Sequence, residues 1–140
     1  MAQLLLFCVA TSNFSLQLGS LFCKSAIAAG AFAAAWIEEL YTEGISGGCG
    51  SGQYCPSDAV TRAQMAVFLL RAEHGSSYLP PPAIGTVFAD VPVNAFAAAW
   101  IERLAAEGIT GGCGGNNYCP SVAVTRGQMA VFLTVTFALP

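Results

Sequence analysis

The sequence has few charged residues and no long uninterrupted apolar run, and both shortages exclude classes of function. Charged side chains make up 9% of the 140 residues, with five Lys or Arg, eight Asp or Glu, and a net charge of −3. Nucleic-acid binding depends on clustered Lys and Arg, so this scattered set gives no reason to expect a nucleic-acid partner. A transmembrane helix needs about 20 consecutive apolar residues, so no transmembrane span is expected.

Side-chain sets that perform catalysis are also missing. The one histidine, His74, stands at the end of a predicted helix beside Gly75, where a capping or helix-dipole role explains it. The carboxylates fall at helix-surface spacing, which is typical of a solvated face rather than of an acid/base pair. We therefore expect no catalytic residue, no enzyme activity and no cofactor.

What the sequence does contain is a tandem repeat. Residues 31–69 align with residues 95–133 at an offset of 64, with nine differences. Self-similarity of this kind defines the unit of the fold. Because 55% of the residues are hydrophobic, the chain has enough apolar side chains for a packed core.

Each repeat begins with a predicted amphipathic helix. Phe32, Trp36, Ile37 and Leu40 follow helical spacing, and the second repeat has the same residues 64 positions later. Each helix should end at a glycine, where the chain turns into a left-handed conformation. These glycines are Gly44 and Gly108.

A second helix should follow in each repeat after a Gly-rich loop. Thr61 with Gln64, and Thr125 with Gln128, fit the capping box that opens a helix. Met65 starts an i, i+3, i+4, i+7 apolar pattern, so this helix is expected to pack one face against its partner in the repeat. Trp36, Met65 and their equivalents are interpreted as core residues.

The predicted fold is therefore all-α, with tandem helix-loop-helix repeats and a disulfide-stapled Gly-rich loop in each. We divide the chain into an N-terminal segment (1–30), a first repeat (31–74), a Pro/Ser linker (75–87) and a second repeat (88–140). The N-terminal segment is either a signal peptide or a non-native start, and the pairing of its Cys8 and Cys23 stays open.

Two cysteine pairs close the Gly-rich loops. Cys49 with Cys55, and Cys113 with Cys119, each enclose five residues, and a local disulfide would stabilise each loop by roughly 2 kcal/mol. A shared zinc site is the alternative, but structural zinc ligands are usually spaced more closely and neither loop contains histidine. We expect disulfides, no metal, and an extracytoplasmic location.

Three runs of the second repeat form a recognisable set: Phe88-Ala89-Asp90-Val91, Gly108-Ile109, and Val124-Thr125-Arg126-Gly127-Gln128. Their F-x-D-V opening, G-I loop and T-R-A-E-like helix start together resemble the S-layer homology domain. The first repeat lacks the F-x-D-V opening. Glutamine replaces the usual glutamate of the last motif, and the cysteines are unlike better-known members.

This resemblance implies non-covalent anchoring of a cell-surface protein to secondary cell-wall polysaccharide, often pyruvylated, through grooves between repeats. Carried over by motif, Arg62 and Arg126 would contact the anionic sugar at equivalent sites, with Asp90, Gly48 and Gly112 as further groove candidates. A cation in the first turn of a helix opposes the helix dipole, which favours a bound anion there.

Two alternatives remain at this stage. The arginines could instead form internal ion pairs, for example with Asp58, Asp90 or a helix glutamate. The whole chain could be a structural repeat that self-associates or packs with a further repeat, rather than a polysaccharide-binding anchor.

Overall fold

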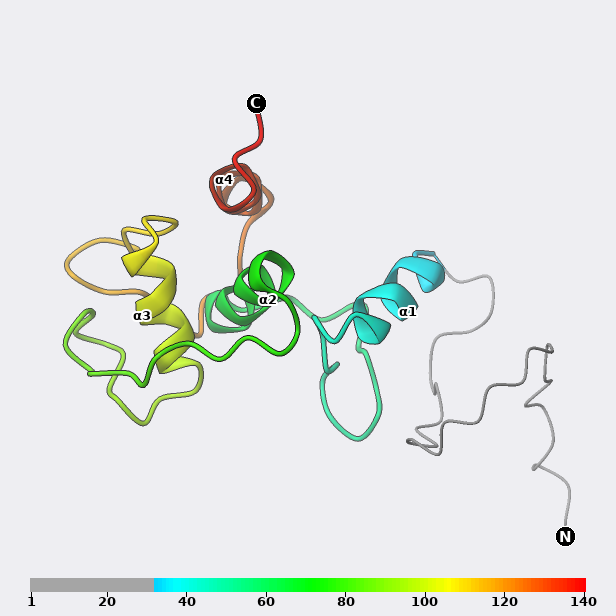
Figure 1. Cartoon of the computed structure of the whole chain (residues 1–140), viewed down its shortest axis with the longest axis horizontal. Helices are drawn as coiled ribbons and strands as arrows, with labels where there is room; N and C mark the ends of the chain where they lie inside the picture. The colour runs from blue at the N-terminus through cyan, green and yellow to red at the C-terminus, as the bar shows by residue number, and fades with distance from the viewer. Residues whose placement is uncertain (1–31) are drawn as a thin grey trace, which may run out of the picture.

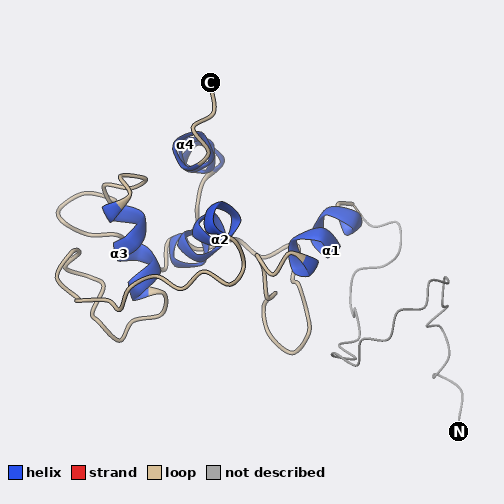
Figure 2. Ribbon diagram, viewed as in Figure 1, coloured by secondary structure: helices blue, strands red, loops and turns tan. Residues whose placement is uncertain are grey.

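The computed structural model describes residues 32–140, and the regular elements of this part of the chain are all α-helices joined by long loops (Figures 1 and 2). The predictions about the N-terminal segment, Cys8 and Cys23 lie outside these residues. The four helices are α1 (Ala34–Thr42), α2 (Arg62–His74), α3 (Ala98–Ala106) and α4 (Arg126–Thr136). None of the helices in residues 32–140 has the length and apolar character to cross a membrane.

Local sequence signals fix where these helices begin and end. The Thr61 and Thr125 hydroxyls each accept a hydrogen bond from the third helical amide, and the glutamine there accepts one from the threonine amide. After α1 and α3 the chain turns at Gly44 and Gly108, which have φ of 69° and 73°. The next amide in each case bonds back to Leu40 or Leu104, which is the Schellman arrangement.

Both Gly-rich loops are closed by a disulfide, as predicted. Loop 1 (residues 43–60) contains the bond Cys49–Cys55, and loop 2 (residues 107–124) contains Cys113–Cys119, each with Cα atoms 6.0 Å apart. Their backbone hydrogen bonds also match, because the amide of the first cysteine bonds to the carbonyl four residues later at 2.8 Å in loop 1 and 2.7 Å in loop 2. The closure of each loop therefore depends on residues within that loop.

The expected packing within each repeat is wrong. The second helix of the first repeat, α2, packs against α3 of the second repeat and less extensively against α4, whereas neither α1 with α2 nor α3 with α4 forms a helix pair. The main core lies along α2 and α3 and includes the fully buried Ala66, Leu70, Ile101 and Leu104. The repeats therefore interlock instead of folding as separate units.

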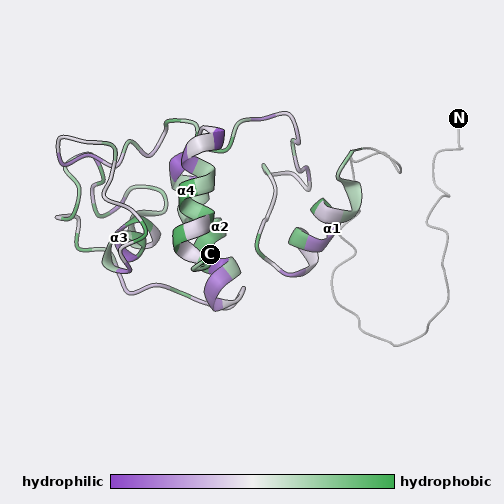
Figure 3. Cartoon of the chain, turned by 90° about the horizontal axis from the view of Figure 1, so that it is seen from above, coloured by the Kyte–Doolittle hydropathy of each residue, from purple (hydrophilic) through white to green (hydrophobic). Residues whose placement is uncertain are grey.

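Helix α1 stands apart from this core (Figure 1), and it packs against none of the other three described helices. Ile37 is its only buried residue, and Trp36 is 76% exposed. The interpretation of Trp36 as a core residue is therefore wrong for the part of the chain that the structure describes, because no element of residues 32–140 covers that side of α1. Figure 3 shows hydrophobic residues on α1 and along α4, and large apolar side chains on both helices are exposed, among them Trp36, Val131 and Leu133.

Candidate functional site

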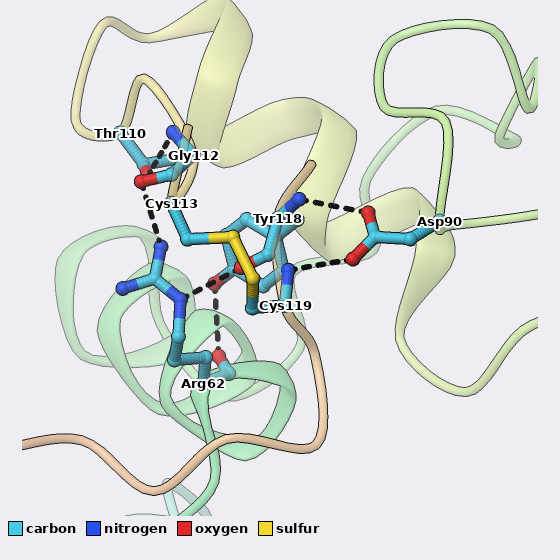
Figure 4. Close-up of a disulfide and its surroundings, with 7 residues drawn as sticks. All are labelled: Arg62, Asp90, Thr110, Gly112, Cys113, Tyr118 and Cys119. Carbon is cyan, nitrogen blue, oxygen red and sulfur yellow. Dashed lines mark hydrogen bonds between the residues drawn. A yellow bond between two sulfur atoms is a disulfide. The ribbon is translucent and has the colours of Figure 1, made fainter. Parts of the chain in front are cut away.

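Arg62, the motif arginine of the first repeat, is buried inside loop 2 of the second repeat (Figure 4). Its side chain is 4% exposed. Its Nε donates to the carbonyl of Tyr118 at 2.8 Å, and its Nη2 donates to the carbonyl of Gly112 at 3.2 Å. The guanidinium carbon lies 4.7 Å from the ring centre of Tyr118 and 5.4 Å from that of Phe132. Arg62 therefore holds the two repeats together.

Tyr118 is the partner that completes this contact. It is fully buried, and its hydroxyl donates to the backbone carbonyl of Arg62 at 2.8 Å. Burial raises the pKa of Tyr118 to about 12, although the positive charge of Arg62 acts in the opposite direction. Sequence reasoning missed this residue as part of the site. The available signal was a tyrosine at the same place in both Gly-rich loops, at Tyr54 and Tyr118.

Asp90 lies on the opposite side of loop 2 and fixes the loop backbone. Its two carboxylate oxygens accept hydrogen bonds from the amides of Tyr118 at 2.7 Å and Cys119 at 2.8 Å (Figure 4). Phe88, two residues earlier, packs its ring 5.4 Å from the ring of Tyr118. The F-x-D-V opening therefore shapes loop 2, and Asp90 faces backbone amides rather than solvent.

The two predicted groove glycines, Gly48 and Gly112, allow a tight loop closure. Both have positive φ, and a Cβ at either position would lie within 2.3 Å of a backbone carbonyl oxygen of its own loop. At Gly112 the added atom would also lie 2.9 Å from the ring of Phe88. The structure brings Arg62, Asp90 and Gly112 together around loop 2, whereas Gly48 lies in loop 1.

Arg126, the motif arginine of the second repeat, is exposed at the first position of α4. The hydrogen-bond partners of Arg62 are backbone carbonyls rather than carboxylates, so the predicted ion pair is not what engages its guanidinium. The two arginines have the same motif but different surroundings. The two arginines therefore have different environments in residues 32–140, and their action at equivalent sites stays a prediction.

A half-open pocket of about 240 Å³ lies where the two repeats meet. The start of α2, the segment before α3 and the end of loop 2 form its wall. Phe96, 69% exposed, gives it an aromatic surface. The lining residues are Thr61, Ala63, Ala95, Phe96, Pro120 and Ser121. The pocket therefore presents an aromatic ring beside the hydroxyl of Ser121, whereas the Thr61 hydroxyl is bonded to Gln64.

Glu73, His74 and Glu107 form a second cluster, which links α2 to the residue after α3. Their ligand-type atoms lie within 4.8 Å of one another, and His74 Nε2 is 2.9 Å from Glu107 Oε1. Arg103 donates to that same oxygen and places a positive charge beside it. The cluster therefore already has an internal cation, which opposes binding of a metal ion. The loop cysteines are paired in disulfides and form no zinc site.

Comparison with known protein families gave a match to both repeats. A model of the S-layer homology domain matches residues 29–66 and again residues 88–130, which together are more than half of the chain. Both matches coincide with the repeats, and the second begins at Phe88 of the F-x-D-V opening. Comparisons with curated proteins and with solved structures gave no match.

Proposed function

Because the chain belongs to the S-layer homology domain family, we propose that it is a non-catalytic anchoring module that binds an anionic cell-wall polysaccharide. Domains of this family are generally cell-surface anchoring modules that bind cell-wall polysaccharide. The observation that carries the proposal is the family match to both repeats. The disulfides support a location outside the cytoplasm, attached to the cell envelope, because such bonds persist in oxidising compartments.

We place the polysaccharide in the pocket between the repeats. A sugar ring has apolar C–H faces and polar edges, so it can cover an exposed aromatic ring while its hydroxyls form hydrogen bonds. Phe96 offers the ring and Ser121 offers a hydroxyl group, whereas the Thr61 hydroxyl is already hydrogen-bonded to Gln64. Because both repeats line the pocket, binding there would depend on the correct joining of the repeats through Arg62.

The acidic groups of the polymer, for example pyruvyl carboxylates, would require a cation. Of the four arginines in residues 32–140, Arg62 is buried, Arg71 donates to the Gly44 carbonyl and Arg103 is paired with Glu107. Arg126 is the remaining one, exposed at the start of a helix whose dipole also favours an anion. Arg126 is therefore the residue that would contact the anionic groups of the polymer. Arg62, Asp90 and Gly112 would support the pocket through loop 2. Gly48 has the position in loop 1 that Gly112 has in loop 2.

Co-sedimentation with purified bacterial cell walls tests the proposal. The oxidised full chain should pellet with intact walls and remain in the supernatant after chemical removal of the secondary polymers. Phe96→Ala should weaken binding by about tenfold, the loss expected from one aromatic contact of about 1.4 kcal/mol. Phe32→Ala is the matched control, because Phe32 has the same place in the first repeat, is 98% exposed and does not line the pocket.

The role of Arg126 is tested separately in the same assay. Arg126→Ala should weaken binding and reduce its dependence on salt, since one charge pair would be lost. Arg126→Lys should retain most of the salt dependence. Equal binding to intact and stripped walls would contradict the polymer as ligand, and unchanged binding by Arg126→Ala would contradict this arginine as the anion contact.

A further inference from the structure

The same sequence is buried in one repeat and exposed in the other, and this difference points to a missing partner. Ala66 and Leu69 on α2 are 0% and 3% exposed, whereas their equivalents on α4, Ala130 and Leu133, are exposed. The sequences match at these positions, so the difference comes from what covers the helix. The neighbours of α2 are α3, loop 2 and, less extensively, α4, whereas nothing in residues 32–140 covers the corresponding face of α4.

The complementary half of the contact is exposed at the other end of the described chain. Leu104 on α3 is fully buried, whereas its equivalent on α1, Leu40, is 36% exposed. Tyr118 in loop 2 is fully buried, whereas Tyr54 in loop 1 is only partly buried. Loop 1 nevertheless has the same disulfide and the same backbone hydrogen bonds as loop 2. It therefore has the shape that receives an arginine in loop 2.

We propose that α4 of one copy of this chain docks on α1 and loop 1 of a second copy. The contact between α2 and the α3–loop 2 unit within the chain is its template. Arg126 would enter loop 1 as Arg62 enters loop 2, with its guanidinium directed at the carbonyls of Tyr54 and Gly48. This inference does not rest on the proposed function.

A second copy fits better than closure of one chain on itself. In the single chain α1 and α4 do not touch each other, and they lie on different sides of the α2–α3 core (Figure 1). A second copy presents both halves without opening that core. Because the two surfaces differ, the contact is head-to-tail, which either closes into a ring or extends into a chain.

Sequence differences predict that the contact between copies is weaker than its template. Thr134 and Val135 on α4 replace Leu70 and Arg71 of α2, and the position 64 residues before Asp90 is Ala26, which has no carboxylate for loop 1. Leu70 is fully buried and Arg71 lies 5.5 Å from the ring centre of Trp100. Association should therefore depend on protein concentration.

Sedimentation velocity of the oxidised full chain over a range of concentrations tests the proposal. The wild-type chain should shift from the mass of one chain to that of two or more. Ala130→Glu should weaken association by about 100-fold or more, because the equivalent Ala66 is fully buried and a carboxylate there would lose its water. Ala106→Glu is the matched control, since Ala106 and its equivalent Thr42 are both exposed.

A mixing experiment tests the head-to-tail geometry. Ala34→Glu changes the receiving surface, because its equivalent Ala98 is 3% exposed, and an acidic residue in the first turn suits α1 itself. Each variant alone should remain a single chain. An equimolar mixture of Ala130→Glu with Ala34→Glu should form a pair, because one intact α4 then meets one intact α1 and loop 1.

The outcomes separate the possible partners. A wild-type chain that remains single at all concentrations would overturn the proposal and favour a further repeat from another protein. Association by Ala34→Glu alone would overturn the head-to-tail geometry, since it would require contact between two like surfaces. Pairing would bury Arg126 in loop 1 of the second copy, so a polymer that binds Arg126 should compete with association. If acidic polymer leaves association unchanged, Arg126 is assigned to pairing rather than to the polymer.

Discussion

Replacing the same motif residue in the two repeats should have very different effects on stability. Arg62 and Arg126 both open a helix behind a threonine cap, and both precede a glutamine of the capping box. Arg62 is 4% exposed, whereas Arg126 is exposed. Alanine at each position therefore compares one buried and one exposed arginine in matched local sequence.

The magnitude follows from the contacts of Arg62. Its guanidinium donates two hydrogen bonds and lies against two aromatic rings. A hydrogen bond from a charged group contributes about 1.5–3 kcal/mol, but these two share one side chain and do not add fully. We expect Arg62→Ala to reduce the free energy of unfolding by about 3 kcal/mol. Arg126→Ala should change it by less than about 0.5 kcal/mol.

Thermal unfolding followed by circular dichroism measures this difference. One kcal/mol shifts Tm by about 3–4 °C in a chain of 140 residues, so Arg62→Ala should lower Tm by about 10 °C and Arg126→Ala by less than about 2 °C. The protein should be dilute and oxidised, so that association does not contribute to stability. Equal Tm values for the two variants would refute the reasoning that Arg62 joins the repeats.

Three further predictions concern loop 2. Asp90→Ala removes the acceptor of two backbone hydrogen bonds and should lower the free energy of unfolding, measured in urea, by about 2–4 kcal/mol. Asp58→Ala removes an exposed carboxylate of loop 1 and should leave that free energy nearly unchanged. Similar losses in the two variants would contradict the role of Asp90. Gly112→Ala should strongly destabilise the protein because the added Cβ would lie 2.3 Å from a carbonyl oxygen. Gly111→Ala is the control, since a Cβ at that position has no atom within 4 Å. Equal unfolding midpoints of the two variants would show that loop 2 adapts to the extra atom. Burial raises the pKa of Tyr118 from 10.0 to about 12. The neutral Tyr118 side chain therefore stabilises the fold fully below pH 10, and this stabilisation, up to about 2–3 kcal/mol, is lost as pH rises toward 12. Tyrosinate absorbance should show that Tyr118 ionises well above pH 10 in the folded protein, and a Tyr118→Phe variant that leaves the high-pH part of the titration unchanged would contradict this.

Much of the local structure could be predicted from the sequence. The threonine caps, the glycines that end α1 and α3, and the two loop disulfides depend on residues a few positions apart. Short-range geometry of this kind is set by helix capping, by residues with positive φ and by disulfide ring closure. Both repeats have the same helix ends and loop closures because their sequences are the same at these positions. The family resemblance also came from such short motifs.

Burial could not be predicted in the same way. Trp36 and Met65 have similar apolar character, yet Trp36 is 76% exposed and Met65 is 4% exposed. Helical spacing identifies an apolar face, but it does not say which element covers that face, or whether the covering element belongs to the same repeat.

The sequence by itself determined the repeats, their helices, their stapled loops and the family to which they belong. Only the tertiary structure decided that α2 packs against the following repeat, that Arg62 is buried in loop 2, and that Arg126 remains exposed. The physical reason is that capping and loop closure are local, whereas burial depends on contacts between residues as far apart as Arg62 and Tyr118. Two identical motifs can therefore have different roles when only one of them meets its partner.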